Sequence, residues 1–180
     1  MSIQSIAVFC GSQSGQSTKF ESDAIALGRL LAEQQITVIY GGGNKGLMAA
    51  VANACMEAGG NVIGVIPDVL TRIERQHTGI SELIVVDSMH TRKGMMYDKC
   101  DAAIILPGGF GTLDELFEML TWNQLNIHNK HLFILNSNGF YEHLMAHIRH
   151  MYQSGFLYSN PEEKISLLEQ VDDLLPFLSL

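Results

Sequence analysis

The stretch that decides the fold covers residues 102–115 and reads AAIILPGGFGTLDE. Its first five residues form an apolar, β-rich run, which predicts a buried strand over 102–106. A glycine-rich turn follows at 107–111, and an amphipathic run predicts a helix over 112–125. In this arrangement free backbone N–H groups and the helix dipole both point into the turn. The stretch therefore predicts a site for an anion such as a phosphate.

Glu115 has two interpretations. Thr112 can add a hydroxyl donor to a bound phosphate, and Glu115 would then lie one helical turn further on, where it suits chemistry on a sugar attached to that phosphate. The sequence TLDE is equally a capping box, in which an N-cap Thr and a Glu at N3 satisfy each other's backbone donors. In that case Glu115 is only structural. Gly108, Gly109 and Gly111 favour the ligand interpretation, because a cap does not require them.

Strand-like and helix-like segments alternate along the whole chain. This alternation predicts an α/β fold: a single Rossmann-like domain over 1–180, with a doubly wound parallel sheet and helices on both faces. Crossovers between parallel strands are right-handed, so the loops after Cys10, Tyr40, Ile66 and Leu106 should meet at one sheet edge. The predicted strands are 5–10, 37–40, 61–66, 83–86, 102–106, 131–135 and 164–168, and the predicted helices are 19–35, 47–58, 89–99, 112–125, 139–153 and 171–180. The charged segment 68–79 is expected to be a loop or a short helix over a site.

Composition limits the classes of function. With 47% apolar and 17% charged residues, the 180-residue chain should fold around a sizeable core. The net charge of −8 argues against polymeric nucleic acid as a partner, because such binding normally needs a basic face. Cys10, Cys55 and Cys100 form no CxxC pair and lie in or beside apolar runs, which favours free thiols in a reducing compartment. No signal peptide or membrane-spanning stretch is found, so we expect a cytoplasmic protein.

A second glycine loop follows the predicted strand 37–40 and reads GGGNKG over 41–46. It matches the GxGxxG fingerprint of dinucleotide-binding domains, and Asp68 lies near the distance expected of a ribose-binding acid. However, the fingerprint normally follows the first strand of its unit, whereas this loop follows the second. A structural tight turn is therefore the favoured interpretation. The loop is not a Walker A motif, because no Gly-Lys-Ser/Thr follows.

Arg92 and Lys93 lie in the first turns of the predicted helix 89–99. Neighbouring helical residues diverge by about 100°, so the two side chains need not share a ligand. A solvated helix face is the simpler interpretation. Against it, an acidic chain that binds an anion needs cations, and only 11 Lys and Arg residues supply them. Arg92 can also hold two oxygen atoms at once, which a lysine cannot.

His143, His147 and His150 have a helical spacing that suggests a metal site. No Asp or Glu completes a ligand set on the same helix face, and no HExxH motif is present. An exposed helix surface is the favoured interpretation. We expect no metal and no organic cofactor.

Apolar residues around the predicted helix 112–125 cover more than one of its faces. A helix that packs on a sheet needs only one apolar stripe. The excess therefore suggests a partner subunit, most simply in a two-fold homodimer. The residues in question are Met119, Leu120, Trp122, Leu125 and Ile127.

These motifs closely resemble those of the LONELY GUY family, whose members were once labelled possible lysine decarboxylases. The family signature PGGxGTxxE is met over 107–115, and a second signature, MHxRKxxM, is met over 89–96. The resemblance runs over about 5–156. Supporting matches are CGS at 10–12, GGGNKGLM at 41–48 and TW at 121–122, whereas Ala49 stands where family members commonly carry glycine.

The resemblance implies a nucleoside 5′-monophosphate phosphoribohydrolase, which hydrolyses the N-glycosidic bond of cytokinin ribotides or AMP to a free base and ribose 5-phosphate. It implies that Arg92 and Glu115 are catalytic. Glu115 could stabilise an oxocarbenium charge or activate water, and Arg92 could hold phosphate or assist the departing base. By the same motif match, substrate contacts are implied for Glu74, Arg92, Lys93, Gly108, Gly109, Phe110, Gly111, Thr112, Leu113, Asp114, Glu115 and Thr121.

Decarboxylation is disfavoured by its chemistry. Pyridoxal enzymes need a Schiff-base lysine in a cofactor pocket, and no lysine of this chain stands in such a context. The alternative from another class is a non-catalytic nucleotide or cofactor carrier on the same fold. Glu115 and Arg92 beside one phosphate loop favour the enzyme. No motif identifies the base of the nucleotide.

Overall fold

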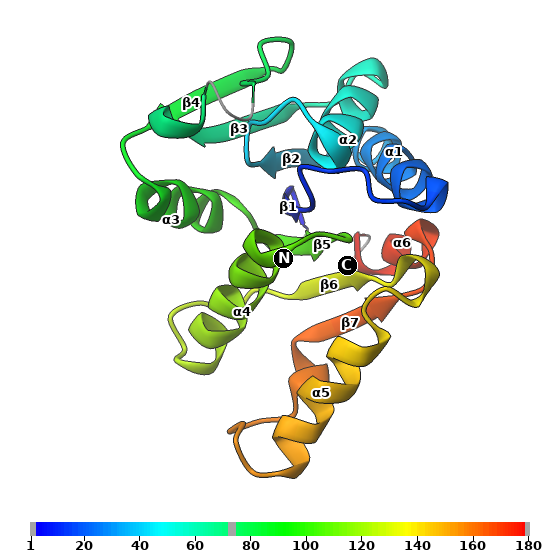
Figure 1. Ribbon diagram of the computed structural model, residues 1–180, viewed down its shortest axis with the longest axis vertical. Coiled ribbons are helices and arrows are strands. Elements are labelled where there is room, and N and C mark those ends of the chain that lie inside the picture. The colour runs from blue at the N-terminus through cyan, green and yellow to red at the C-terminus, as the bar shows by residue number, and fades with distance from the viewer. Residues whose placement is uncertain (1–2, 72–74, 179–180) are drawn as a thin grey trace.

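The computed structural model describes residues 3–71 and 75–178, which fold around one seven-stranded sheet (Figure 1). The strands are β1 (Ser5–Phe9), β2 (Thr37–Tyr40), β3 (Val62–Pro67), β4 (Glu82–Val86), β5 (Ala102–Ile105), β6 (Leu132–Leu135) and β7 (Ile165–Leu168). They lie in the order β4-β3-β2-β1-β5-β6-β7, and every neighbouring pair is parallel. The predicted doubly wound α/β fold is confirmed.

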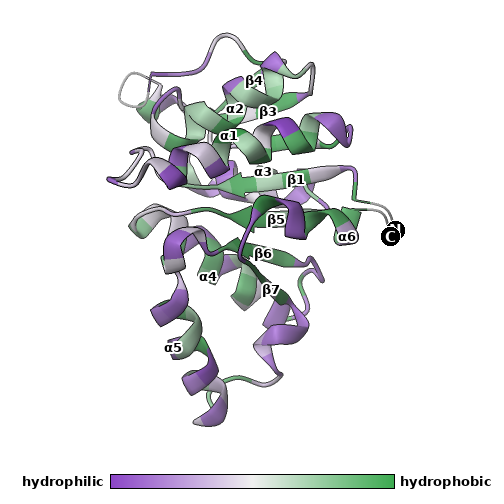
Figure 2. Ribbon diagram, turned by 90° about the vertical axis from the view of Figure 1, so that its right-hand side faces the viewer, coloured by the Kyte–Doolittle hydropathy of each residue, from purple (hydrophilic) through white to green (hydrophobic). Residues whose placement is uncertain are grey.

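Helices cover both faces of this sheet. They are α1 (Thr18–Glu33), α2 (Gly46–Glu57), α3 (Met89–Lys99), α4 (Phe110–Gln124), α5 (Glu142–Gln153) and α6 (Leu175–Leu178). One core contains residues of α1, α2 and α6, and the other contains residues of α3, α4 and α5. Along β1, Ile6 and Val8 belong to the first core, and Ala7 and Phe9 belong to the second. Figure 2 shows the matching colours, with hydrophobic strands and hydrophilic patches on α5.

The winding of the chain reverses between β1 and β5. In the register of the sheet, Ala7 of β1 lies beside Ile39 of β2 on one side and Ala103 of β5 on the other. The chain proceeds outward from β1 to β4, and α3 then carries it back to β5 (Figure 1). The connections after β1 and β5 lead to α1 and α4 on opposite faces of the sheet, and at such a reversal α/β proteins form a crevice. Ligands of α/β proteins bind in this crevice, at the carboxyl ends of the strands.

Two predicted helices near the C-terminus differ from the observed ones. The predicted helix 139–153 begins only at Glu142, because Asn138 and Gly139 have left-handed backbones (φ 52° and 69°) that interrupt helical geometry. The predicted helix 171–180 consists of a 3₁₀ turn, Val171–Leu174, followed by the short α6. Pro176 explains the break, because it has no N–H to continue a helical ladder from the preceding turn.

The segment 68–79, which the sequence predicts to be a loop or a short helix, begins with a 3₁₀ turn at Asp68–Leu70. Further on, Gln76 forms an isolated β-bridge with Gly43. Glu74, a predicted substrate contact, lies outside the described residues. In the parts of the chain that the structure describes, no helix is both long enough and apolar enough to cross a membrane.

Candidate active site

Three strand-to-helix loops meet at the carboxyl edge of the sheet. Gly11, which follows β1, donates its N–H to the carbonyl of Pro107, which follows β5, at 3.0 Å. The carbonyl of Gly11 accepts the N–H of Leu47 in the first turn of α2, at 3.1 Å. These bonds join the loops that precede α1, α2 and α4. The predicted convergence of the loops is therefore confirmed for these three.

α4 begins beside this junction without a side-chain cap. Gly109 is the N-cap residue, with φ −97° and ψ −153°. The N–H groups of Phe110, Gly111 and Thr112 have no intrahelical acceptor, because they precede the first complete helical turn. A Cβ on Gly109 or Gly111 would meet no described atom within 4 Å, so a ligand can approach the backbone closely there. This geometry suits the binding of a phosphate-like anion.

Thr112 packs against the same turn. Its side chain is buried, and a Cβ built on Gly108 would overlap its Oγ1. Gly108 is therefore required by packing inside the protein, whereas Gly109 and Gly111 are not. The Thr112 hydroxyl lies on the turn that carries the unpaired N–H groups, so it can donate to the same anion.

The capping-box interpretation of Glu115 is wrong. α4 begins at Phe110, so Thr112 is its third residue and Glu115 its sixth, while the N-cap is Gly109. A capping box needs its polar pair at N-cap and N3. The extended backbone of Gly109 places the N-cap three residues earlier than the TLDE pattern suggested. Glu115 is buried, with 8% exposure, and its position requires another explanation.

Arg92 is buried as well, so the solvated-face interpretation is wrong for this residue. It lies near the start of α3 and is 6% exposed. Its guanidinium lies against Gly41, so closely that a Cβ built on Gly41 would overlap Nη2. Within 3–71 and 75–178, its Nε has no hydrogen-bond partner, and no carboxylate forms an ion pair with the side chain. A buried guanidinium is costly without a partner, so its chemistry calls for an anionic ligand.

The environment of Cys10, just after β1, connects Arg92 with Glu115. Burial raises the pKa of the Cys10 thiol, the Glu115 carboxylate raises it further, and the Arg92 guanidinium lowers it. Both charges therefore act at one buried point, although Glu115 comes from α4 and Arg92 from α3. At neutral pH the thiol stays protonated, so Cys10 is not a thiolate nucleophile.

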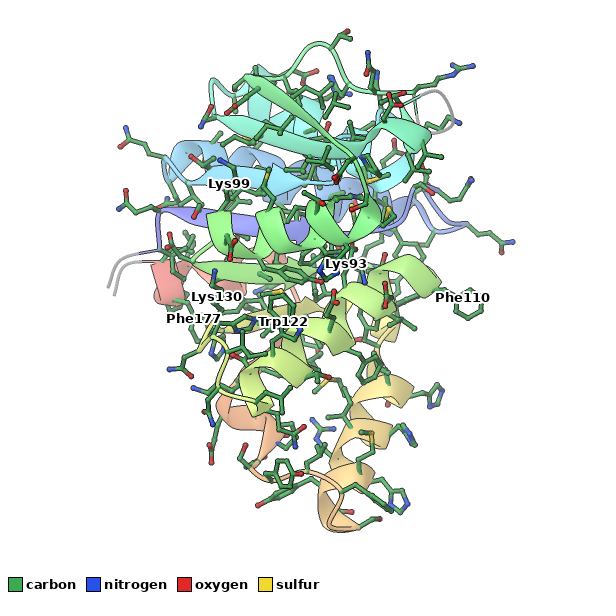
Figure 3. All side chains as sticks on the ribbon, turned by 90° about the vertical axis from the view of Figure 1, so that its left-hand side faces the viewer. Lys93, Lys99, Phe110, Trp122, Lys130 and Phe177 are labelled. Carbon is green, nitrogen blue, oxygen red and sulfur yellow. The ribbon has the colours of Figure 1, made fainter. Side chains whose placement is uncertain are left out.

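Lys93 connects the two helices that carry these charges (Figure 3). Its Nζ lies 2.6 Å from Oδ2 of Asp114 and 3.1 Å from Oε2 of Glu118. Burial alone would lower the pKa of Lys93, but the bonds to the two carboxylates outweigh this effect and raise it. Tyr97 donates its hydroxyl to the same Glu118 oxygen at 2.6 Å. The network holds α3 and α4 in a defined relation, and with them Arg92 and Glu115.

Other predicted substrate contacts lie further apart. Phe110 is 94% exposed and projects away from the ribbon in Figure 3. Leu113 packs against the core beneath α3, α4 and α5. Thr121 donates its hydroxyl to the carbonyl of Phe117 at 2.7 Å and lines a separate hollow between α4 and α5. The structure therefore brings Arg92, Glu115 and the glycine turn together, but not Thr121.

A hollow of about 320 Å³ adjoins the glycine turn, a volume within the range of small-molecule sites. It is bordered by 11–15, 107–109 and Leu47, and by Phe20 and Phe140, whose rings pack edge to face at 5.6 Å. The hollow lies toward the α1 and α2 face, whereas Arg92 and Glu115 reach the edge from α3 and α4. Sequence reasoning missed the two phenylalanines, because no local motif marks residues that reach the turn from distant elements.

A larger hollow of about 460 Å³ lies between α4 and α5. Its charged lining residues, Glu163 and Lys164, are not buried, and it is bordered by the distal part of α4. We assign the ligand site to the glycine turn instead, because among the described residues this edge of the sheet combines a helix N-terminus with the two buried charges of Arg92 and Glu115.

The histidines of α5 do not form a metal site in the structure. His143, His147 and His150 are all exposed. Among the residues described, no group of three or more His, Cys, Asp and Glu side chains is placed to hold a metal ion. The three histidines thus lie on a solvated helix face.

Comparison with known proteins identifies relatives in sequence. The family model described as possible lysine decarboxylase matches residues 48–178. A cytokinin riboside 5′-monophosphate phosphoribohydrolase of Rhodococcoides fascians is 41% identical over 170 residues, which cover 94% of this chain and 86% of that protein. An Arabidopsis thaliana phosphoribohydrolase with the same description is 41% identical over 173 residues, which cover 96% and 81%.

Comparison with solved structures identifies the same fold. The molybdenum cofactor binding protein of Rippkaea orientalis has a TM-score of 0.74 at 21% identity, and the match covers 99% of this chain and 97% of that one. The Moco carrier protein of Chlamydomonas reinhardtii has a TM-score of 0.71 at 18% identity, with 97% and 94% covered. Likeness at such identities shows the fold alone. By its sequence relatives and its two signatures, the chain belongs to the LONELY GUY family.

Proposed function

We propose that this chain is a nucleoside 5′-monophosphate phosphoribohydrolase, which hydrolyses the N-glycosidic bond of cytokinin ribotides, of AMP, or of both. The observation that carries this proposal is the meeting of Arg92 and Glu115, both buried and of opposite charge, behind an uncapped helix N-terminus. The names of the relatives at 41% identity support the same activity.

The 5′-phosphate would bind at the turn 108–112, where three backbone N–H groups and the Thr112 hydroxyl can donate to it. Binding there would fix the ribose close to the first turns of α4. Glu115 lies about one helical turn beyond Thr112. Its carboxylate would therefore lie next to the ribose and not next to the phosphate. Binding energy from the phosphate thus positions the bond that reacts.

In the reaction, a water oxygen forms a bond to C1′ as the bond between C1′ and the base nitrogen breaks. One proton of the water is released, and the departing base takes up a proton. Glu115 would accept the proton of the water or stabilise the positive charge that develops on the sugar. Arg92 would hold the phosphate or assist the departing base through its two-pronged guanidinium.

The remaining substrate contacts rest on the family resemblance. Glu74 and Thr121 stay predictions, as do Lys93 and Asp114. Lys93 and Asp114 form an ion pair with each other. A substrate that contacts either side chain would therefore have to weaken or replace this ion pair. No metal or organic cofactor takes part in this proposal.

The proposed assembly is a homodimer. The apolar set on which this prediction rested is only partly exposed: Met119 is fully buried in the core, whereas Leu125 and Ile127 are each 59% exposed. Leu125 and Ile127 are the residues of this set that a second subunit would cover.

We place the protein in the cytoplasm because Cys10, Cys55 and Cys100 are free thiols. The domain assignment 1–180 and the exclusion of polymeric nucleic acid also stay proposals.

The carrier alternative draws on the fold likeness to molybdenum cofactor proteins. A carrier needs a pocket and affinity, but it does not need a buried carboxylate and a guanidinium at the same edge as a phosphate turn. The much closer sequence relatives are named phosphoribohydrolases. The enzyme is therefore the better supported function.

The test measures free base released from a panel of nucleoside 5′-monophosphates, including AMP and its N6-substituted analogues, by chromatography. We expect base release from at least one member, together with ribose 5-phosphate in equal amount. Glu115→Gln serves as the control that separates the enzyme from contaminating activity. Binding of a nucleotide without base release would instead support the carrier.

A further inference from the structure

The first glycine of the loop 41–46 lies directly against the guanidinium of Arg92. A Cβ built on Gly41 would overlap Nη2 and would lie 3.0 Å from Cζ of Arg92. Gly41 has no positive φ, so its backbone conformation does not require a glycine. The absence of a side chain at this position is required by the arginine.

Neutral sulfur atoms lie beside both the guanidinium and Gly41. Nη1 of Arg92 lies 3.7 Å from Sδ of Met89. Sδ of Met48 lies 3.3 Å from the position of a Cβ on Gly41. Thioethers are weak acceptors and carry no charge. No described carboxylate forms an ion pair with Arg92, so among the described residues it is the shape of this slot that places the guanidinium.

Hydrogen bonds hold the wall of the slot in place. The carbonyl of Gly42 accepts the N–H of His77 at 2.9 Å, and the N–H of Asn44 donates to the carbonyl of Arg75 at 2.9 Å. The next anchor is the bond from Leu47 to Gly11 described above. His77 is itself held, because its Nε2 lies 2.9 Å from Oδ1 of Asn53 in α2. These bonds fix the loop after Gly41, and the pairing of Tyr40 with Gly64 of β3 fixes the chain before it.

We infer that Gly41 is a positioning residue for Arg92. The bare backbone at this position leaves room for the guanidinium at the carboxyl end of β2. This inference rests on the proposed function, in which Arg92 acts on the substrate. It also gives the first glycine of the GxGxxG pattern a use that involves no dinucleotide.

The test is Gly41→Ala. The overlapping atoms are at the end of a flexible side chain, so the variant should fold while the guanidinium is displaced from its slot. We expect kcat/KM for AMP to fall by about 10-fold to 100-fold, as small misplacements of a catalytic group do. The matched control is Gly94→Ala, the same chemical change on the helix of Arg92, where a Cβ meets no described atom within 4 Å. Gly94→Ala should keep wild-type kinetics.

A double-mutant cycle separates positioning from a general packing defect. In an Arg92→Lys background, Gly41→Ala should lower kcat/KM by less than about twofold, because the displaced group is already gone. An equal fall in both backgrounds would overturn the inference, as would wild-type kinetics in Gly41→Ala.

A second double-mutant cycle tests the contact between Gly41 and Arg92 by protein stability, with no enzyme assay. Gly41→Ala should lower the midpoint of urea unfolding in the wild-type background and leave it unchanged in Arg92→Ala, where the slot is open. Equal shifts in both backgrounds would overturn the contact itself. If no nucleotide is hydrolysed by the wild type, the proposed function fails, and this cycle still decides whether Gly41 and Arg92 are coupled.

Discussion

The two glycine turns of this protein look alike in sequence but differ in what occupies the space beside them. Each follows a central strand and opens a helix, 41–46 before α2 and 107–111 before α4. At the first turn, side chains added to Gly41 or Gly46 would overlap Arg92 or the backbone at 12–13. At the second, side chains on Gly109 and Gly111 would meet no described atom within 4 Å.

The difference shows why glycine patterns alone are weak indicators of ligands. The first turn is filled by the protein, and the N–H of Leu47 in its helix is bonded to Gly11. The second turn has packing reasons only for Gly108, so its outer glycines are available for a ligand. The turn that matches the dinucleotide fingerprint is thus the occupied one, and the turn predicted to bind phosphate is the open one.

Glu115→Gln should have the largest effect and would show that the open turn serves catalysis. The amide has the size of the carboxylate but no charge, so base release from AMP should fall by about 10²–10⁴. AMP binding, measured by calorimetry, should persist because the turn is untouched. Normal turnover in a variant that melts like the wild type would remove Glu115 from the catalytic residues.

Removal of the 5′-phosphate from the substrate tests the ligand of the open turn. Adenosine should be hydrolysed at least about 10²-fold more slowly than AMP, because binding of the phosphate positions the ribose. The measurement is kcat/KM for both compounds with the same enzyme preparation. Equal values would mean that the uncapped end of α4 does not bind the phosphate.

Arg92→Lys tests the guanidinium that lies against the turn 41–46 and is proposed to act on the ligand at the turn 107–111. Lysine keeps the positive charge but loses the planar fork, so kcat/KM should fall by about 10-fold to 100-fold, the range expected for charged hydrogen bonds. The melting temperature should not fall, because the buried guanidinium has no ion-pair partner among the described residues. Wild-type kinetics would contradict a catalytic role for the fork.

A pair of alanine substitutions compares the two turns directly. Gly46→Ala should lower the free energy of unfolding by about 1–3 kcal/mol, because φ is +55° and a Cβ would overlap backbone atoms of Ser12 and Gln13. Gly109→Ala should change it by less than about 0.5 kcal/mol but weaken AMP binding. Urea unfolding and calorimetry provide both quantities. A loss of stability in Gly109→Ala together with a loss of AMP binding in Gly46→Ala would contradict the roles assigned to the two turns.

The smallest expected effect concerns Cys10, beside both turns. Its pKa is raised, so the folded state retains a proton that the unfolded chain loses above its ordinary thiol pKa. The contribution of this thiol to stability is thus complete at neutral pH and declines as the pH rises above about 9. Iodoacetamide at pH 7.5 should therefore leave Cys10 unmodified and activity unchanged, as mass spectrometry and the base-release assay can establish. Rapid alkylation of Cys10 would contradict the buried, protonated thiol.

The sequence by itself determined the alternation of strands and helices and the doubly wound parallel fold. Strands buried on both faces, such as β1 and β5, consist of continuous apolar runs, and the helices between them have a clear periodicity. Right-handed crossovers then place the loops after these strands at one edge. The anion-binding turn was predictable for the same reason: its backbone donors and glycines belong to one short segment, 107–112.

The tertiary structure decided which residues meet at that edge. The start of α4 at Phe110 depends on the extended backbone of Gly109, not on the TLDE pattern. The burial of Arg92 depends on Gly41, far away in the chain, and the border of the hollow depends on Phe20 and Phe140. A local pattern records what neighbouring residues need, such as an apolar face or a backbone donor. It does not record which distant backbone leaves room for a guanidinium, because that space exists only after α2, α3 and α4 have packed on the sheet.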